Sequence, residues 1–230
     1  VIASQANGAI CQSTLAAITA ASKFNKPIKL IIFNSPANIE LFSQCALIDE
    51  VIDLKHASFS GDLAEFMAPA CLHVINGDAY AVIMAANAAG KNLLPRIAIK
   101  LDCDVISNVV NIDESGVELE HVIYAGDIVE TLQVEIFPCA FLVNASKFAQ
   151  ADCLNENKCK VRVISEFELP NIAIEHIEAV DVNQEAVTLS SANVVVAGGR
   201  ALGSKDNFLR LKQFANSIGA AVGATRAAVD

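Results

Sequence analysis

The sequence contains no tryptophan and no cluster of lysine and arginine residues. Its 26 acidic residues outnumber its 16 basic ones, which gives a formal net charge of −10. A protein that binds the phosphate backbone of a nucleic acid needs clustered basic side chains, so we expect no nucleic-acid partner. No window approaches 18 uncharged apolar residues either, and we therefore predict no membrane span.

The cysteines and histidines also lack the spacing of a metal site. The seven cysteines include no C-x-x-C pair, and the closest two, Cys153 and Cys159, have five residues between them. The four histidines are scattered along the chain. An odd number of irregularly spaced cysteines is typical of reduced thiols, so we predict free cysteines and no metal.

Apolar residues make up 53% of the sequence. Their spacing alternates along the chain between patterns typical of strands and patterns typical of helices. Apolar runs at 28–33, 51–54 and 80–85 predict strands. A first helix is predicted to follow Ser13, which can cap it, and a second to begin at Ser35-Pro36. Two further helices are predicted over residues 60–71 and 87–101. This alternation is typical of right-handed crossovers and a mainly parallel sheet with flanking helices, that is, an α/β fold.

From residue 105 to 164 the pattern changes to β-branched segments separated by turns. We predict an antiparallel β excursion here, with consecutive strands over 118–124, 127–136 and 137–144 and a further strand over 158–164. Residues 166–193 are acidic and weakly patterned, as a connection between domains would be. We therefore expect an N-terminal α/β domain over residues 1–190.

The α/β pattern restarts in residues 191–230. A buried strand at 193–197 precedes a glycine-rich turn at 198–203, and Ser204 is expected to cap a helix. A second strand at 220–222 follows, and Thr225 and Arg226 come soon after it. A strand-turn-helix-strand fragment cannot bury both faces of its sheet, so we expect the truncated start of a second α/β domain.

The glycine-rich turn is the sharpest candidate for a binding site. Glycines between a strand and a helix let the backbone approach a phosphate, and the helix offers free N–H groups. The spacing, G-G-x-x-x-G, is neither the dinucleotide fingerprint nor a P-loop. If the two strands are neighbours, Arg200, Thr225 and Arg226 converge at the carboxyl end of the sheet, where such folds bind ligands. A plain tight turn with solvent-exposed arginines is the open alternative.

Three segments resemble the alpha subunit of electron transfer flavoproteins: residues 90–96, Gly198-Gly199-Arg200, and the run V-G-A-T-R-A-A-V-D at 222–230. The resemblance covers nearly the whole chain. It implies a heterodimer with a beta subunit that holds one FAD. Such a carrier accepts electrons from acyl-CoA dehydrogenases of fatty acid β-oxidation and from other dehydrogenases, and passes them to a membrane quinone oxidoreductase. The resemblance also implies the bacterial cytoplasm or the mitochondrial matrix.

By the same resemblance, the domain over residues 1–190 would be a scaffold that packs against the beta subunit. Gly199, Arg200 and Thr225 would bind FAD, and Arg226 would lie near the isoalloxazine ring. Arg96 would face the mobile flavin domain. No side chain would do acid/base chemistry, so the protein would be a redox carrier rather than an enzyme with its own substrate. The loops expected to hold the pyrophosphate and adenosine would lie beyond Asp230, which makes the FAD site incomplete in this chain.

Two other functions fit parts of the pattern. The first is a non-redox adenine-nucleotide-binding or scaffolding α/β domain. The second is a nicotinamide dehydrogenase, which would need the standard glycine fingerprint and a ribose-binding acidic residue about 20 residues later. The helix after Gly203 leads instead to Asn216 and Ser217.

Overall fold

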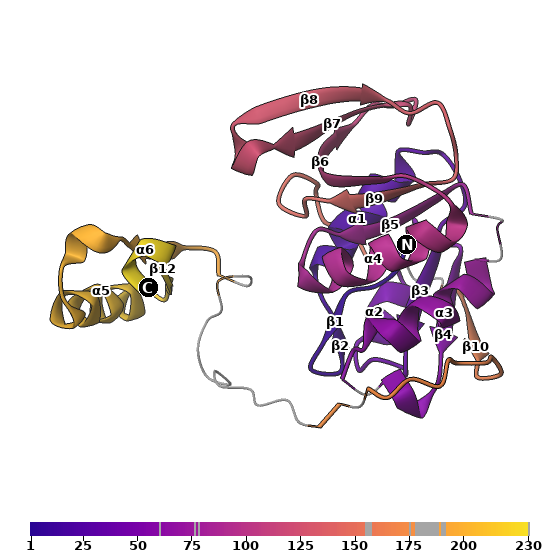
Figure 1. Cartoon of the computed structure of the whole chain (residues 1–230), viewed down its shortest axis with the longest axis horizontal. Helices are drawn as coiled ribbons and strands as arrows, with labels where there is room; N and C mark the ends of the chain where they lie inside the picture. Colours follow the sequence, from indigo (N-terminus) through magenta and orange to yellow (C-terminus); the bar gives the residue numbers. More distant parts are fainter. Residues whose placement is uncertain are drawn as a thin grey trace. The chain divides into compact units, whose positions relative to one another are not determined.

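The computed structural model describes residues 1–59, 61–75, 77, 79–154, 158–174, 176–177, 189 and 192–229. The chain forms two compact units, Val1–Ile177 and Glu178–Asp230, which we describe separately (Figure 1). The domain boundary predicted at residue 190 lies outside the described residues.

The first unit is built on a largely parallel sheet. Its strands are hydrogen-bonded in two groups, β10-β4-β3 and β5-β9-β6-β7-β8. The N-terminal residues connect the groups, because Ile2 N–H donates to Ile83 O (3.0 Å) and Ala3 N–H donates to Ile31 O (2.9 Å). The strands are β3 (Lys29–Phe33), β4 (Glu50–Leu54), β5 (Ala81–Ala85), β6 (Val105–Ile112), β7 (Glu118–Ile123), β8 (Ile128–Gln133), β9 (Cys139–Val143) and β10 (Lys160–Ile164).

Apolar side chains cover both faces of the central strands. In β3, Leu30 and Ile32 belong to one hydrophobic cluster, whereas Ile31 and Phe33 belong to another. Successive side chains of a strand point to opposite faces, so an unbroken apolar run fills two cores at once. All five residues of β9 are buried in the same way.

Helices supply the other side of each core. Leu15 and Ile18 of α1 join one cluster, and Met67 of α3 and Leu94 of α4 join the other. The packing of α4 against the sheet is close: a Cβ on Gly90 would lie far inside van der Waals contact with Ala85 O. The helices are α1 (Ser13–Ser22), α2 (Ile39–Ser43), α3 (Ala64–Ile75) and α4 (Ala88–Leu101), with 3-10 turns η1 (Ala57–Phe59) and η2 (Tyr124–Gly126).

Some predicted helix starts were wrong. Ser13 is the first residue of α1 rather than its cap, which is Gln12 without a side-chain hydrogen bond. Helix α2 begins at Ile39 instead of Ser35-Pro36, because Asn34 and Ser35 adopt left-handed backbone conformations (φ 53° and 47°) that a right-handed helix excludes. Helix α3, predicted over residues 60–71, begins at Ala64, since residues 61–63 are not helical; residue 60 itself lies outside the described residues.

The antiparallel excursion is confirmed for part of its predicted length. Strands β6, β7 and β8 pair antiparallel, with β7 and β8 in register over six residue pairs. The prediction was wrong for β9 and β10. Strand β9 lies between β5 and β6 and is parallel to both, and β10 is parallel to β4. Both strands thus return to the parallel sheet, where each pairs with a strand from an earlier part of the chain.

A short hairpin follows the N-terminal segment. Strands β1 (Gln5–Ala6) and β2 (Ala9–Ile10) pair antiparallel across Asn7-Gly8. Both turn residues have positive φ (51° and 72°), as the predicted Asn-Gly turn requires.

The second unit contains two parallel strands and a capped helix. Its elements are β11 (Val195–Gly198), η3 (Arg200–Leu202), α5 (Lys205–Ser217), β12 (Ala221–Ala224) and α6 (Arg226–Val229). Ser204 is the N-cap of α5, as predicted, and its side chain accepts a hydrogen bond from Asn207 N–H (3.2 Å).

All seven cysteines are free, as predicted. Among the described residues, no group of three or more acidic, histidine or cysteine side chains is placed to hold a metal ion. No described helix combines the length and apolarity that crossing a bilayer would demand.

The buried thiols lead to a testable prediction. Burial raises the pKa of Cys139 to about 11 and that of Cys153 to about 12, and it raises the pKa of Cys71 further. Because the thiolate is the nucleophile, we expect these three cysteines to resist alkylation at pH 8 in the folded chain. In denaturant without reductant, all seven should react. Mass spectrometry of the alkylated chain checks both results, and fewer than seven labels in denaturant would contradict free cysteines.

Candidate functional site

The glycine-rich turn and the Thr225-Arg226 pair follow two neighbouring strand ends. Strands β11 and β12 are parallel, with Gly198 level with Ala224. Thr225 N–H donates to Gly198 O (3.0 Å), which extends the pairing past the strands. The residues that come next, Gly199-Arg200 on one side and Arg226 on the other, therefore leave the same edge of the sheet.

Local packing explains the first glycine of the turn. A Cβ on Gly198 would collide with Leu202 and would lie 2.9 Å from Leu211 Cδ2, so these two side chains would have to shift to admit a larger residue. Gly203 has a φ of +68°, and its N–H donates to Arg200 O (3.0 Å). Asn207 of α5 then holds the turn by donating to Leu202 O (2.7 Å).

Gly199 differs from Gly198, because the protein's own atoms leave room beside it. Its backbone is extended, and a Cβ there would meet Thr225 Oγ1 at 3.5 Å, an ordinary contact. Arg200, Thr225 and Arg226, which follow the two strand ends, are exposed. Two guanidinium groups and a hydroxyl are suited to hold an anionic or oxygen-rich group, such as a phosphate or a reduced flavin.

The other sequence candidate, residues 90–96, lies on α4 in the first unit. Arg96 forms an ion pair with Glu65 of α3 (2.8 Å), and its Nε donates to Asn92 Oδ1 (3.3 Å). Gly90 at the start of the segment allows the close approach of α4 to β5. The described contacts of both residues lie within this helix pair and the adjacent sheet.

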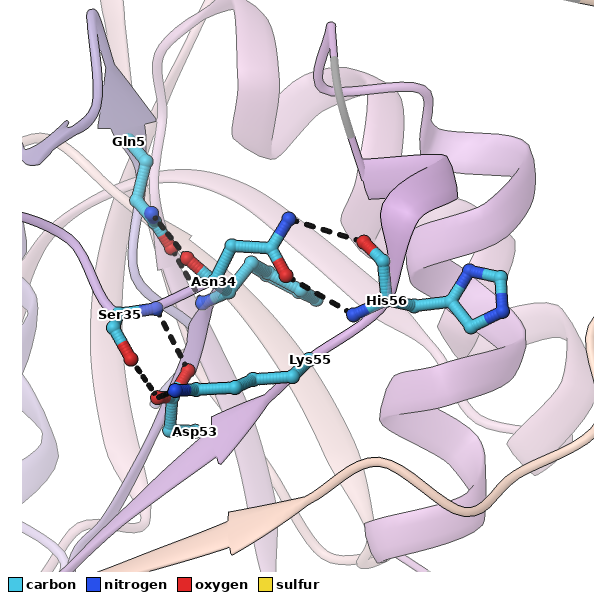
Figure 2. A network of polar contacts seen from close by, with 7 residues as sticks. Gln5, Asn34, Ser35, Asp53, Lys55 and His56 are labelled. Carbon is cyan, nitrogen blue, oxygen red and sulfur yellow. Dashed lines mark hydrogen bonds and ion pairs between the residues drawn. The ribbon is translucent and has the colours of Figure 1, made fainter.

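Sequence analysis missed a polar network at the carboxyl ends of β3 and β4, drawn in Figure 2. The carboxylate of Asp53 is buried and accepts hydrogen bonds from Ser35 N–H (3.0 Å) and Ser35 Oγ (2.5 Å). Lys55 Nζ lies 3.8 Å from it. Asp53 thereby holds Ser35 in its left-handed conformation. The two side chains are 18 positions apart, so no local pattern could have revealed the pair.

Amide side chains complete this network. Gln5 bonds both backbone groups of Phe33, with Phe33 N–H donating to Oε1 (2.7 Å) and Nε2 donating to Phe33 O (2.9 Å). Asn34 makes the same two-bond contact with His56 (3.0 Å each; Figure 2). The polar groups at this edge are therefore engaged with one another.

The cavity near this edge is small. It is lined by Gln5, Asp62 and Asn92 among others and measures about 20 Å³, whereas ligand pockets span roughly 300–1,000 Å³. This cavity is therefore too small to hold an adenine nucleotide.

Asp53→Ala is expected to lower the free energy of unfolding by about 2 kcal/mol, because it leaves the Ser35 N–H and hydroxyl without their acceptor. Asp53→Asn, which keeps an acceptor oxygen, should lose less. Urea denaturation measures both variants. Equal loss in the two would show that the carboxylate charge, rather than the hydrogen bonds to Ser35, holds the loop.

Comparisons with known proteins also divide the chain into two parts. The sequence-family model of the electron transfer flavoprotein domain matches residues 1–169. The family model of the electron transfer flavoprotein FAD-binding domain matches residues 188–230. Over its whole length, the chain is 32% identical to a mitochondrial electron transfer flavoprotein subunit alpha of Oryza sativa subsp. indica, and it covers 68% of that protein.

The chain belongs to the electron transfer flavoprotein alpha-subunit family. It is also similar to the mitochondrial alpha subunit of Arabidopsis thaliana (31% identical, all of this chain, 67% of the relative). The alpha subunit of Pseudomonas aeruginosa is 30% identical over all of this chain and 74% of its own length. Within the FAD-binding match lie the glycine-rich turn, Thr225 and Arg226.

Proposed function

We propose that this chain is the alpha subunit of a flavin-dependent electron carrier. With a beta subunit it holds one FAD, accepts electrons from acyl-CoA and other dehydrogenases and passes them to a membrane quinone oxidoreductase. The observation that carries the proposal is the FAD-binding-domain match over residues 188–230, which contains the two neighbouring strand ends that Arg200, Thr225 and Arg226 follow.

The residues at this edge fit the polar parts of a flavin nucleotide. Gly199 leaves its side open to a ligand, and the Thr225 hydroxyl beside it can donate a hydrogen bond. Arg200 supplies a permanent positive charge for an anionic group, and Arg226 is planar and can lie against a ring. When FAD is bound, it supplies the electron transfer, and the protein sets its potential and access.

The proposed partner subunit and cellular location are taken from the relatives. Those in rice and Arabidopsis are named as mitochondrial, and another is bacterial. We propose that this chain works in the mitochondrial matrix or the bacterial cytoplasm, paired with a beta subunit. An obligate pair of this kind is expected to bury more than about 2,000 Å².

Absorbance tests the proposal. The full-length alpha subunit is co-expressed with the beta subunit of its source, purified, and examined for visible flavin absorbance, and the released flavin is identified by chromatography. Bleaching on anaerobic mixing with a substrate-reduced acyl-CoA dehydrogenase would then show electron acceptance. A colourless complex that fails to take up added FAD would instead support a non-redox scaffold.

A further inference from the structure

The chain stays on the first unit after the last strand of that unit ends. Strand β10 ends at Ile164, yet the first unit continues to Ile177. We call residues 165–177 the strap, whose described residues follow β10 as an orange trace in Figure 1. Phe167 and Leu169 of the strap pack against the hydrophobic cluster that holds the core residues of α3 and α4.

Phe167 lies among three other rings. It is stacked on Phe59, with ring centroids 5.8 Å apart and an angle of 19° between the ring planes. The ring centroids of His56 and His73 lie 5.9 and 6.1 Å from that of Phe167. These distances are in the range of favourable ring contacts. We call the three residues that surround Phe167, namely His56, Phe59 and His73, the cradle.

The cradle is held in place by the first unit itself. Phe59 is buried and packs edge to face on Phe33, with ring centroids 5.2 Å apart. The backbone of His56 is fixed by the polar network of Figure 2, and its Nδ1 accepts a hydrogen bond from Ser58 N–H (3.1 Å). His73 belongs to α3. The cradle therefore keeps these supports when the strap leaves it.

The strap is attached much more weakly than the strands and helices. As far as the described residues show, no backbone–backbone hydrogen bond joins it to the rest of the first unit. An open hollow of about 640 Å³ lies beside it, lined by Pro69, His73, Glu166, Phe167 and Glu168. Near its far end, the ring of His176 covers Gly61, where a Cβ would collide with it. A segment held by a few side chains opens at a lower free-energy cost than a core strand or helix.

We propose that the strap is a releasable latch, held by Phe167 in the cradle, that sets the length of chain joining the two units. When the strap is docked, the connection starts after Ile177, and when it is released, the connection starts after Ile164. The released strap adds at most about 45 Å, at roughly 3.3–3.6 Å for each extended residue. A longer connection lets the second unit search a larger volume and lowers its effective concentration at any one site. This inference is independent of the proposed function, since it uses only contacts within the first unit.

Phe167→Ala in the full-length alpha subunit tests the latch. Glutamyl endopeptidase cleaves after Glu166 and Glu168, and it needs the strap to leave the cradle. The variant is expected to be cleaved there about tenfold faster than the wild type, because cleavage follows the population of the open form. Each rate is divided by that of a synthetic peptide of the same sequence, which removes the effect of the substitution on the protease itself. Mass spectrometry of the fragments measures the rates.

Ile174→Ala is the matched control, because Ile174 belongs to the same strap and is 47% exposed. It should change the cleavage rate by less than about twofold. Small-angle X-ray scattering then measures the connection: the maximum dimension should increase in Phe167→Ala and stay unchanged in Ile174→Ala. Circular dichroism verifies folding, and Leu169→Ala, which removes a contact with the same hydrophobic cluster, replaces Phe167→Ala if that variant does not fold.

Three results would overturn the latch. If the wild-type strap is cleaved as fast as the free peptide, it is not docked. If its cleavage depends on urea as steeply as global unfolding does, the strap does not open on its own. If Phe167→Ala is cleaved faster but keeps the dimensions of the wild type, the strap does not set the length of the connection. None of these results depends on bound flavin, so the proposed function is tested separately.

Discussion

Gly90→Ala is expected to lower the free energy of unfolding of the first unit by about 3 kcal/mol. Replacing a glycine inside a helix by alanine normally increases the stability of the protein, because alanine has a higher helix propensity by about 1 kcal/mol. Here the added Cβ would collide with Ala85 O and would lie 3.1 Å from Leu142 Cδ2. A backbone carbonyl of a buried strand cannot move aside, so α4 must shift away from β5.

Thermal unfolding measures this effect. For a unit of this size, a loss of about 3 kcal/mol corresponds to a fall in Tm of roughly 6–12 °C. The neighbouring exposed Lys91 gives the control, because Lys91→Ala should stay within about 0.5 kcal/mol of the wild type. A Gly90→Ala chain with a raised Tm would show that α4 does not approach the sheet this closely.

Arg226→Ala in the flavin-loaded heterodimer is expected to lower the reduction potential of the flavin by on the order of 40–130 mV. The guanidinium stays protonated over the working pH range, and its charge favours a reduced flavin, which is more negative than the oxidised form. Arg226→Lys should recover part of the loss, since it keeps the charge but not the planar group.

Spectroelectrochemistry measures the potential, with FAD content determined in parallel. Arg210, an exposed arginine on α5, provides the control, and Arg210→Ala should shift the potential by less than about 10 mV, a small part of the 59 mV that marks a tenfold change. If Arg226→Ala keeps both its FAD and its potential, Arg226 is a surface charge and has no role in tuning the flavin.

The sequence predicted the elements whose signal is local. Adjacent residues were enough to predict the apolar strand β3, the Asn7-Gly8 turn and the capped helix after Gly203. The turn between β11 and α5 was recognisable for the same reason, because its glycines stand directly between a strand and a helix.

Pairing partners were harder to predict because they depend on distant segments. Residues 137–144 were assigned to an antiparallel excursion because they follow two antiparallel strands. The apolar side chains at every position of Cys139–Val143 were the missed signal, since a strand covered on both faces is typical of a parallel sheet. Asp53 was missed for a related reason: its partner, Ser35, belongs to the loop after another strand.

The position of β9 has a consequence for how the chain is made. Strands β5 and β6 leave the ribosome before β9, the strand that separates them in the sheet, and β4 receives its outer neighbour β10 later still. Parallel pairing between distant segments is slow, and synthesis adds only about 5–20 residues per second. The nascent chain therefore exposes apolar strand edges until residue 164 has emerged, an interval in which chaperones can bind it. A chain cut before Cys139 is expected to aggregate, whereas a cut after Ile164 leaves the sheet complete.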